Sequence, residues 1–174
     1  VVFALPLLPD DSTLKILPPL ESSSYIELTL SSLQMFGINI ERKNRFYYKI
    51  YGKQTYRAPS ERVQVEGDWS QAAFWLVAGT IGSGEKVRCK GLNRDSLQGD
   101  RAILTILRRM GAKFIVRKDM ITVLPARLHG CEIDASDCPD LVPVLSVAAA
   151  VAEGTTHIIH AGRLRIKECD RLTT

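Results

Sequence analysis

The residues best suited to chemistry form a charged run near the C-terminal end of the chain. Four positive charges occur within the nine residues from Arg163 to Arg171. Lys167 and Arg171 are four residues apart, so a helix would place them on one face with Glu168 beside them. Two cations near a helix N-terminus form a seat for phosphate or carboxylate, and an adjacent Glu is suited to donate a proton. A solvated ion-pair face on a surface helix is the alternative, and the pattern leaves both open.

Asp140 is a second candidate, because it follows Cys138 and Pro139 at the expected start of an apolar helix. Proline is common at the first helical position, and the helix dipole favours a carboxylate in the first turn. A capping role would explain Asp140 completely. The functional alternative is a general base at the mouth of a buried helix.

A third cluster is Glu21-Ser-Ser-Ser-Tyr25. Serines before a helix are ordinary caps. The alternative is that hydroxyls such as that of Ser22, grouped with Tyr25, hold a polyhydroxylated ligand and its phosphate.

An internal repeat of 70 residues organises the elements that must position these groups. In this register Gly84 lies over Gly154, and Asp100-Arg101 lies over Asp170-Arg171. The position equivalent to Asp140 in the preceding unit is Ser70, where the Asp68–Gln71 spacing predicts a capping box with Asp68 as the cap. A looser copy begins near Ser12. The repeat predicts α+β modules that share a core of buried helices.

Each unit is expected to contain a helix, a short strand, a second helix and two further strands. The first helix, around residues 72–78, is apolar nearly all round, which predicts burial on every side. The second helix, about residues 100–110, is amphipathic and ends with Gly111 as its C′ residue. The predicted strands are residues 87–90, 112–117 and 120–124.

The first copy follows the same plan. Gly37 ends its helix, and residues 38–40 and 46–51 are expected as strands. After residue 160 a further helix is expected that carries Lys167 and Arg171 and still runs at Thr174. Four residues are expected on the inner face of the first-copy helix: Tyr25, Leu28, Leu33 and Phe36.

Composition excludes several classes of protein. The chain has 174 residues and is 45% hydrophobic and 24% charged, which is typical of globular domains. The net charge of +4 is divided evenly on either side of Glu66, so there is no basic arm for nucleic acid. The apolar run of residues 142–152 is shorter than the roughly 20 residues that span a bilayer, and no signal peptide opens the chain. The four cysteines lack C-x-x-C spacing, which predicts reduced thiols and no zinc site.

Several motifs together resemble the EPSP synthase family, whose members are 3-phosphoshikimate 1-carboxyvinyltransferases. The resemblance extends from about Phe3 to Leu172. The Lys-Glu-x-Asp-Arg run with the Pro-Asp turn is its most specific part. The motifs are Val65-Glu-Gly-Asp68-Trp-Ser-Gln, Leu97-Gln-Gly-Asp100, Met110-Gly-Ala, Cys138-Pro-Asp140 and Arg165-Ile-Lys-Glu-Cys-Asp-Arg-Leu172.

The resemblance implies a fold of repeated βαβαββ units, an inside-out α/β barrel in each of two domains, with the active site in the cleft between them. Residues 1–65 are then expected to be the last unit of the N-terminal domain, and residues 66–174 the early units of the C-terminal domain. The polar stretch 58–67 is either an ordinary loop or this interdomain hinge. Several family motifs are not in the chain, among them a Ser-Ser-Gln segment and the basic residues that clamp phosphoenolpyruvate. We therefore expect an internal part of a longer enzyme, inactive in isolation.

The implied reaction moves the enolpyruvyl group of phosphoenolpyruvate to the 5-hydroxyl of shikimate 3-phosphate and releases phosphate, with no cofactor or metal. By resemblance, Asp140 is the base and Glu168 the proton donor. The resemblance implies that the enzyme binds these two small-molecule substrates and neither nucleic acid nor a membrane. It also implies a cytoplasmic enzyme that is monomeric at full length. The remaining site residues would bind substrate: Ser22, Tyr25, Arg163, Lys167 and Arg171.

Departures and alternatives accompany this interpretation. Arg163 stands where some family members have Asn. The sequence Arg163-Leu-Arg-Ile-Lys-Glu168 resembles that of the glyphosate-tolerant class of the family. Cys169 replaces a small hydroxyl residue. The alternatives are a UDP-sugar enolpyruvyl transferase, an RNA 3′-terminal phosphate cyclase and a non-catalytic anion-binding module. A chloroplast origin is a further possibility.

Overall fold

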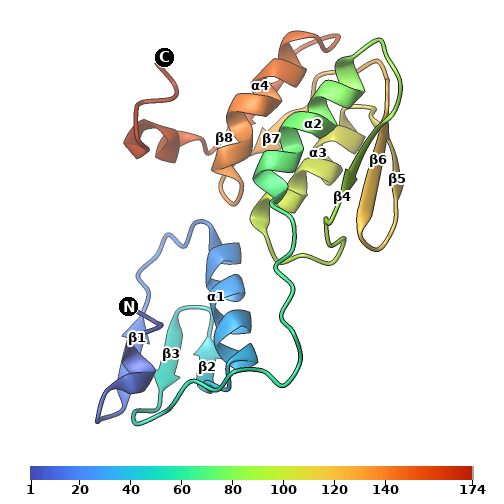
Figure 1. The fold of residues 1–174 in the computed structure, drawn as a ribbon. Coiled ribbons are helices and arrows are strands. Elements are labelled where there is room, and N and C mark those ends of the chain that lie inside the picture. Colours follow the sequence, from blue (N-terminus) through green and yellow to red (C-terminus); the bar gives the residue numbers. More distant parts are fainter. Residues whose placement is uncertain (174) are drawn as a thin grey trace. The chain divides into compact units, whose positions relative to one another are not determined.

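A computed structural model describes residues 1–173 of the chain (Figure 1), so Thr174, where the last predicted helix was expected to continue, lies outside the described residues. The chain divides into two compact units, residues 1–65 and the residues from Glu66 onward. The assignment of these units to the N-terminal and C-terminal domains of a longer enzyme stays a prediction. Within the described residues, every helix is too short or too polar to cross a membrane.

Unit 1 consists of one helix and a three-stranded antiparallel sheet, preceded by a 3-10 turn at Leu5–Leu7. The strand order in the sheet is β1-β3-β2, so the last strand lies between the other two. The elements are β1 (Ser12–Lys15), α1 (Ser23–Met35), β2 (Ile40–Asn44) and β3 (Tyr47–Ile50).

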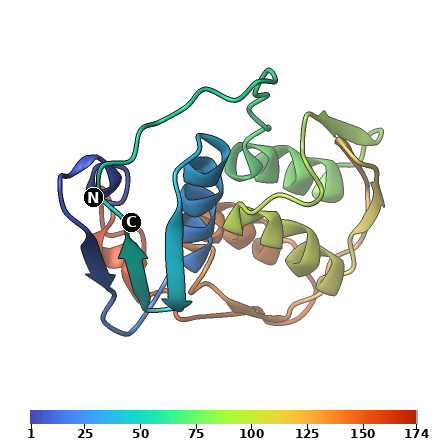
Figure 2. The same ribbon diagram turned by 90° about the horizontal axis from the view of Figure 1, so that it is seen from below.

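Unit 2 contains three helices, an antiparallel sheet of order β4-β6-β5 and a parallel pair, β7-β8. The helices lie together on one side of the three-stranded sheet (Figure 1 and Figure 2). Its helices are α2 (Trp69–Ile81), α3 (Ile103–Arg109) and α4 (Val142–Ala150), and its 3-10 segments are η2 (Gly99–Ala102), η3 (Pro139–Leu141) and η4 (Gly162–Ile166). Its strands are β4 (Val87–Lys90), β5 (Lys113–Val116), β6 (Met120–Leu124), β7 (Glu132–Asp134) and β8 (His157–Ile159).

The structure confirms the predicted repeat. The sheet orders β1-β3-β2 and β4-β6-β5 are the same, with the last strand at the centre in each case. In the second register, β4 follows α2 as β8 follows α4. The strands predicted at residues 87–90 and 120–124 have the predicted bounds.

Two glycines end helices as the sequence predicts. Gly37 and Gly111 have φ angles of 78° and 104°, a conformation that disfavours residues with a side chain. After α1, Gly37 N donates to Gln34 O and Ile38 N donates to Leu33 O. After α3, the bonds from Gly111 and Ala112 repeat this Schellman pattern.

The core of unit 2 lies where α2 packs on β4 and β6. A Cβ at Gly79 would lie 2.6 Å from Val123 Cγ1 and 2.8 Å from Val87 Cβ, so the helix approaches the sheet at its closest through this glycine. Leu76 and Val77 are also buried, but Phe74 and Trp75 are 52% and 66% exposed. The prediction that this helix is buried on every side is therefore wrong for the described residues, because one sheet and one neighbouring helix cover only part of its circumference.

Two details of unit 1 also correct the predictions. Leu33 is buried and Leu28 partly buried, but Tyr25 and Phe36 are 51% and 37% exposed, so the inner face of α1 is narrower than expected. The second strand begins at Ile40 and not at Ile38, because the helix-ending bond from Ile38 N back to Leu33 O still holds that residue in the turn.

Candidate active site

Asp140 lies at the start of α4, in the first turn that the sequence predicts. Pro139 opens the 3-10 segment η3, which leads directly into α4, and Pro143 occupies an early position of α4. Prolines lack the N–H that other residues must have satisfied at a helix start. No side chain caps either segment. Asp140 lies in the first turn, where the helix dipole favours a carboxylate, but no side-chain cap bond engages it, so its carboxylate is available for other partners.

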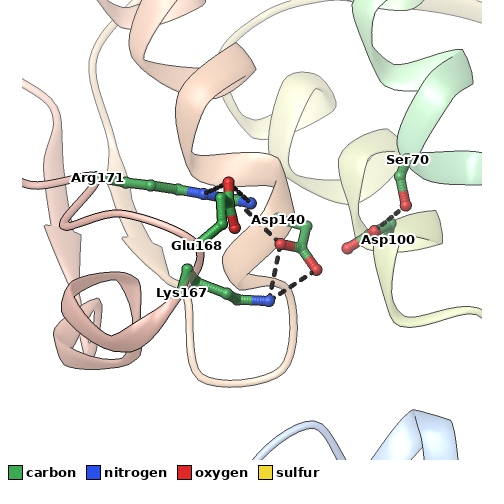
Figure 3. A network of polar contacts seen from close by, with 6 residues as sticks. All are labelled: Ser70, Asp100, Asp140, Lys167, Glu168 and Arg171. Carbon is green, nitrogen blue, oxygen red and sulfur yellow. Dashed lines mark hydrogen bonds and ion pairs between the residues drawn. The ribbon is translucent and has the colours of Figure 1, made fainter. Parts of the chain in front are cut away.

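Those partners are Lys167 and Arg171 (Figure 3). Lys167 Nζ lies 2.9 Å from Asp140 Oδ1 and 3.2 Å from Oδ2. Arg171 Nη1 lies 3.0 Å from Asp140 Oδ1, while Arg171 Nη2 lies 2.6 Å from Glu168 Oε1. The side chains of Asp140, Lys167 and Arg171 are only 22–27% exposed, whereas that of Glu168 is 65% exposed. The structure thus brings together four of the predicted site residues, which we call the Asp140 cluster.

The segment that carries the two cations is not the predicted helix. The 3-10 segment η4 ends at Ile166, and Lys167 is extended, with φ −78° and ψ −162°. Asp170 Oδ1 then accepts a hydrogen bond from Leu172 N, and Asp170 Oδ2 pairs with Arg165. Such a local side-chain bond offers the backbone an alternative to helical bonding. Lys167 and Arg171 therefore meet at Asp140 through a turn and not along one helix face.

Electrostatics favour the ionised form of both carboxylates in the cluster. Partial burial raises the pKa of Asp140, but the hydrogen bonds and charges of Lys167 and Arg171 outweigh it, so the pKa lies below its usual value. The backbone N–H of Glu168 and the Arg171 side chain lower the pKa of Glu168. With both carboxylates ionised, Asp140 is ready to accept a proton.

A further carboxylate, not singled out by the sequence analysis, adjoins the cluster. Asp100 in η2 is only 5% exposed and accepts a hydrogen bond from Ser70 Oγ at the start of α2. Figure 3 shows it beside Asp140. Burial raises the pKa of Asp100, and the negative charge of Asp140 adds to this. Its place in the Asp-Arg pair that recurs at residues 170 and 171 was the available signal.

Hydrogen bonds hold the segment with Asp100 against the start of α2. Asp68 Oδ1 accepts from Ser70 N at 2.8 Å and from Gln71 N at 3.3 Å, which confirms Asp68 as the helix cap. Gln98 Oε1 accepts from Trp69 N at 2.9 Å. Because η2 follows Gln98 directly, these bonds fix the position from which Asp100 faces the cluster.

The other predicted substrate-binding residues lie elsewhere. Arg163 belongs to η4 and is partly buried. Ser22 and Tyr25 lie in unit 1, so a role for them in the same site stays a prediction. Ser22 is 8% exposed, has a left-handed φ of 53° and makes no side-chain cap to α1. A non-glycine residue in this conformation costs backbone energy, and such strain is common at functional sites.

Two further features of the described residues concern metal ligands and thiols. Across residues 1–173 there is no group of three or more His, Cys, Asp or Glu side chains that could hold a metal. Burial raises the pKa of Cys138, the residue before Pro139, to about 11. This thiol is therefore protonated at neutral pH and is not a ready nucleophile.

Comparison with known proteins finds a family and several relatives that the chain resembles. The family model described as EPSP synthase (3-phosphoshikimate 1-carboxyvinyltransferase) matches residues 1–174. The 3-phosphoshikimate 1-carboxyvinyltransferase of Clostridium novyi is 48% identical over 99% of the chain, and so is that of Clostridioides difficile. The chain spans 39% and 38% of the lengths of these two relatives.

Solved structures show the same fold. The EPSP synthase of Acinetobacter baumannii aligns with 94% of the chain at a TM-score of 0.73 and 24% identity, and the chain covers 38% of that protein. The enolpyruvyl transferase NikO of Streptomyces tendae aligns with 90% of the chain at a TM-score of 0.71, also at 24% identity, and the chain covers 37% of it. The predicted α+β fold is therefore confirmed as that of the enolpyruvyl transferases. The match of the family model over the whole chain establishes that the chain belongs to the EPSP synthase family.

Proposed function

We propose that the complete protein containing this chain transfers the enolpyruvyl group of phosphoenolpyruvate to the 5-hydroxyl of shikimate 3-phosphate and releases phosphate. The Asp140 cluster carries the proposal, because it joins a partly buried carboxylate and two cations in a chain 48% identical to named 3-phosphoshikimate 1-carboxyvinyltransferases. The substrates bear two phosphates and two carboxylates between them, and the cations of the cluster suit such ligands.

In the proposed reaction Asp140 accepts the proton of the 5-hydroxyl as the oxygen attacks C2 of phosphoenolpyruvate. Glu168 gives a proton to the methylene carbon, which forms a tetrahedral intermediate. Glu168 then takes a proton back from the new methyl group, Asp140 gives its proton to the departing phosphate, and the carbon–carbon double bond is restored. Each carboxylate thus changes protonation state twice in a turnover.

Arg171 offers a reason why Glu168 can become a donor. In the structure Arg171 binds both carboxylates, and the backbone N–H of Glu168 and the Arg171 side chain lower the pKa of Glu168. A substrate phosphate or carboxylate that draws Arg171 away removes part of this stabilisation of the anion. The pKa of Glu168 then rises, so substrate binding itself prepares the proton donor.

The other assignments follow from the resemblance. Lys167 is proposed to contact the phosphate of shikimate 3-phosphate or to assist protonation, and Arg171 to bind phosphoenolpyruvate. Ser22, with Tyr25 beside it, is proposed to contact the shikimate phosphate, and Arg163 to lie near the shikimate group. We expect a monomeric cytoplasmic enzyme that acts on these small molecules.

The test uses the complete enzyme and measures release of phosphate from phosphoenolpyruvate that depends on shikimate 3-phosphate. Glu168→Gln keeps the size of the side chain but cannot donate the proton, so turnover should fall by about 10²–10⁴-fold. Glu153→Gln, at an exposed glutamate of the same unit, is the matched control and should retain activity. Wild-type protein without this phosphate release would refute the function, and normal turnover of Glu168→Gln would refute the role of Glu168.

A further inference from the structure

The side of the three-stranded sheet in unit 2 that faces away from the helices carries a concentration of positive charge. On β4, Val87 and Cys89 pack on the core, so the alternate residues Arg88 and Lys90 lie on the opposite face. Lys86, one residue before β4, continues this row. The three cations are exposed and succeed one another at every second residue.

The register of the sheet places further groups beside this row. Arg88 pairs with Thr122 on the central strand β6, and Thr122 pairs with Ile115 on β5. Lys90 pairs with Met120, whose carbonyl accepts a hydrogen bond from Arg117 N. A fourth cation, Arg117, thus stands across the central strand from the row on β4.

These side chains line a groove of about 460 Å³, which is within the size range of small-molecule sites. The groove is lined by four cations, a threonine and two apolar residues, with no acidic and no aromatic side chain. The nearest acidic residues in sequence, Glu85 and Asp119, are not part of the lining.

Two physical features indicate that the groove suits a ligand. In the part of the chain that the structure describes, no side-chain ion pair or hydrogen bond engages any of the four cations. Cations two residues apart on a strand are about 7 Å from one another, within the screening length of physiological salt, so they repel each other until an anion neutralises them. Thr122 lines the groove yet is only 4% exposed, and the hydrogen bonds described for residues 1–173 do not include its hydroxyl.

We propose that this groove, formed by Lys86, Arg88, Lys90, Arg117 and Thr122, binds a small ligand that carries a chain of phosphate groups. Several cations around the Thr122 hydroxyl match several linked phosphates better than a single anion. The absence of aromatic lining residues disfavours single-stranded nucleic acid, which proteins hold by stacking of the bases. The proposal does not depend on the enolpyruvyl transfer, because none of the groove residues belongs to the Asp140 cluster.

The test is calorimetric titration of the complete protein at low salt with tripolyphosphate, ATP and orthophosphate in separate arms. We expect saturable binding of tripolyphosphate, weaker binding of orthophosphate, and affinity that falls as salt is added. Equal binding of ATP and tripolyphosphate would assign recognition to the phosphate chain alone. Tighter binding of ATP would add a contribution from the nucleoside.

The variants locate the binding. Replacement of Arg88 and Lys90 together by Gln should weaken tripolyphosphate binding by about tenfold or more, and Thr122→Val should weaken it severalfold without a change of charge. Arg108→Gln removes a cation of α3 outside the groove and should change the affinity less than twofold.

Three results would overturn the proposal. The first is no saturable binding at millimolar tripolyphosphate, and the second is tighter binding of an oligonucleotide than of tripolyphosphate. The third is binding that the Arg88 and Lys90 double variant retains but Lys167→Gln abolishes, because the ligand would then occupy the Asp140 cluster.

Discussion

The starts of α2 and α4 occupy the same register of the repeat, yet they use polar groups differently. Ser70 and Asp140 are equivalent positions, 70 residues apart. At α2, Asp68 caps the helix and Ser70 donates to Asp100, so the polar groups satisfy one another. At α4, prolines reduce the number of free N–H groups, and Asp140 instead pairs with the side chains of Lys167 and Arg171.

This contrast shows how one module supports both structure and chemistry. A carboxylate that caps a helix is committed to the backbone, and moving it would cost stability. A carboxylate held only by flexible cations can exchange them for a ligand. Under the proposed function, Asp140 is therefore the carboxylate that can exchange its partners for substrate, while the start of α2 keeps Asp100 in place beside the cluster.

The largest expected effect separates the equivalent arginines Arg101 and Arg171. Arg171→Gln removes the cation shared by Asp140 and Glu168, so kcat/KM of the complete enzyme should fall by about 10²–10³-fold. Arg101 is exposed and donates to the carbonyl of Arg94, so Arg101→Gln should stay within about twofold. Equal losses of kcat/KM in the two variants would show that Arg171 has no role that the equivalent Arg101 lacks.

The two neighbouring aspartates should show opposite pH dependence of stability. Asp140 has a lowered pKa in the folded state, so its stabilising effect is present above the unfolded value of about 3.9 and is lost as pH falls through the folded value. Asp100 has a raised pKa, so its ionisation destabilises the fold as pH rises above about 3.9, and the cost is complete above the folded value.

Urea unfolding of Asp140→Asn and Asp100→Asn between about pH 2 and 8 checks these signs, because the contribution of Asp140 changes below about pH 3.9 and that of Asp100 above it. Relative to wild type, Asp140→Asn should become less stable as pH rises, and Asp100→Asn should become more stable. The same trend in both variants would show that the two carboxylates do not lie in different environments.

The smallest effect concerns the cap of α2. Asp68→Ala should lower the free energy of unfolding by about 1 kcal/mol, because two N–H groups lose their acceptor. Asp68→Asn keeps an acceptor and serves as the control, so its free energy of unfolding should fall by only a few tenths of a kcal/mol. If Asp68→Ala unfolds at the wild-type urea concentration, the cap is not what secures this helix start.

Local signals predict much of the fold. Gly37 and Gly111 end helices as expected, because glycine has no Cβ and adopts positive φ angles more readily than other residues. Asp68 caps α2 because capping depends on neighbours in sequence. The strands β4 and β6 likewise have their predicted bounds, and the burial of β4 alternates because the sheet has one face on the core.

Predictions that depend on tertiary context were less successful. Phe74 and Trp75 look like core residues, but their exposure depends on what surrounds α2. The helix expected at Lys167 gives way to a turn held by Asp170. The pair of Ser70 and Asp100 joins residues 30 positions apart, which no local pattern reveals.

The central claim is that the repeat position with a carboxylate is catalytic and its equivalent with a hydroxyl is not. The most direct measurement is kcat of the complete enzyme for Asp140→Ala beside Ser70→Ala, with thermal unfolding to confirm that both variants are folded. We predict that Asp140→Ala loses at least about 100-fold more turnover than Ser70→Ala. Equal losses, or a larger loss in Ser70→Ala, would contradict the account.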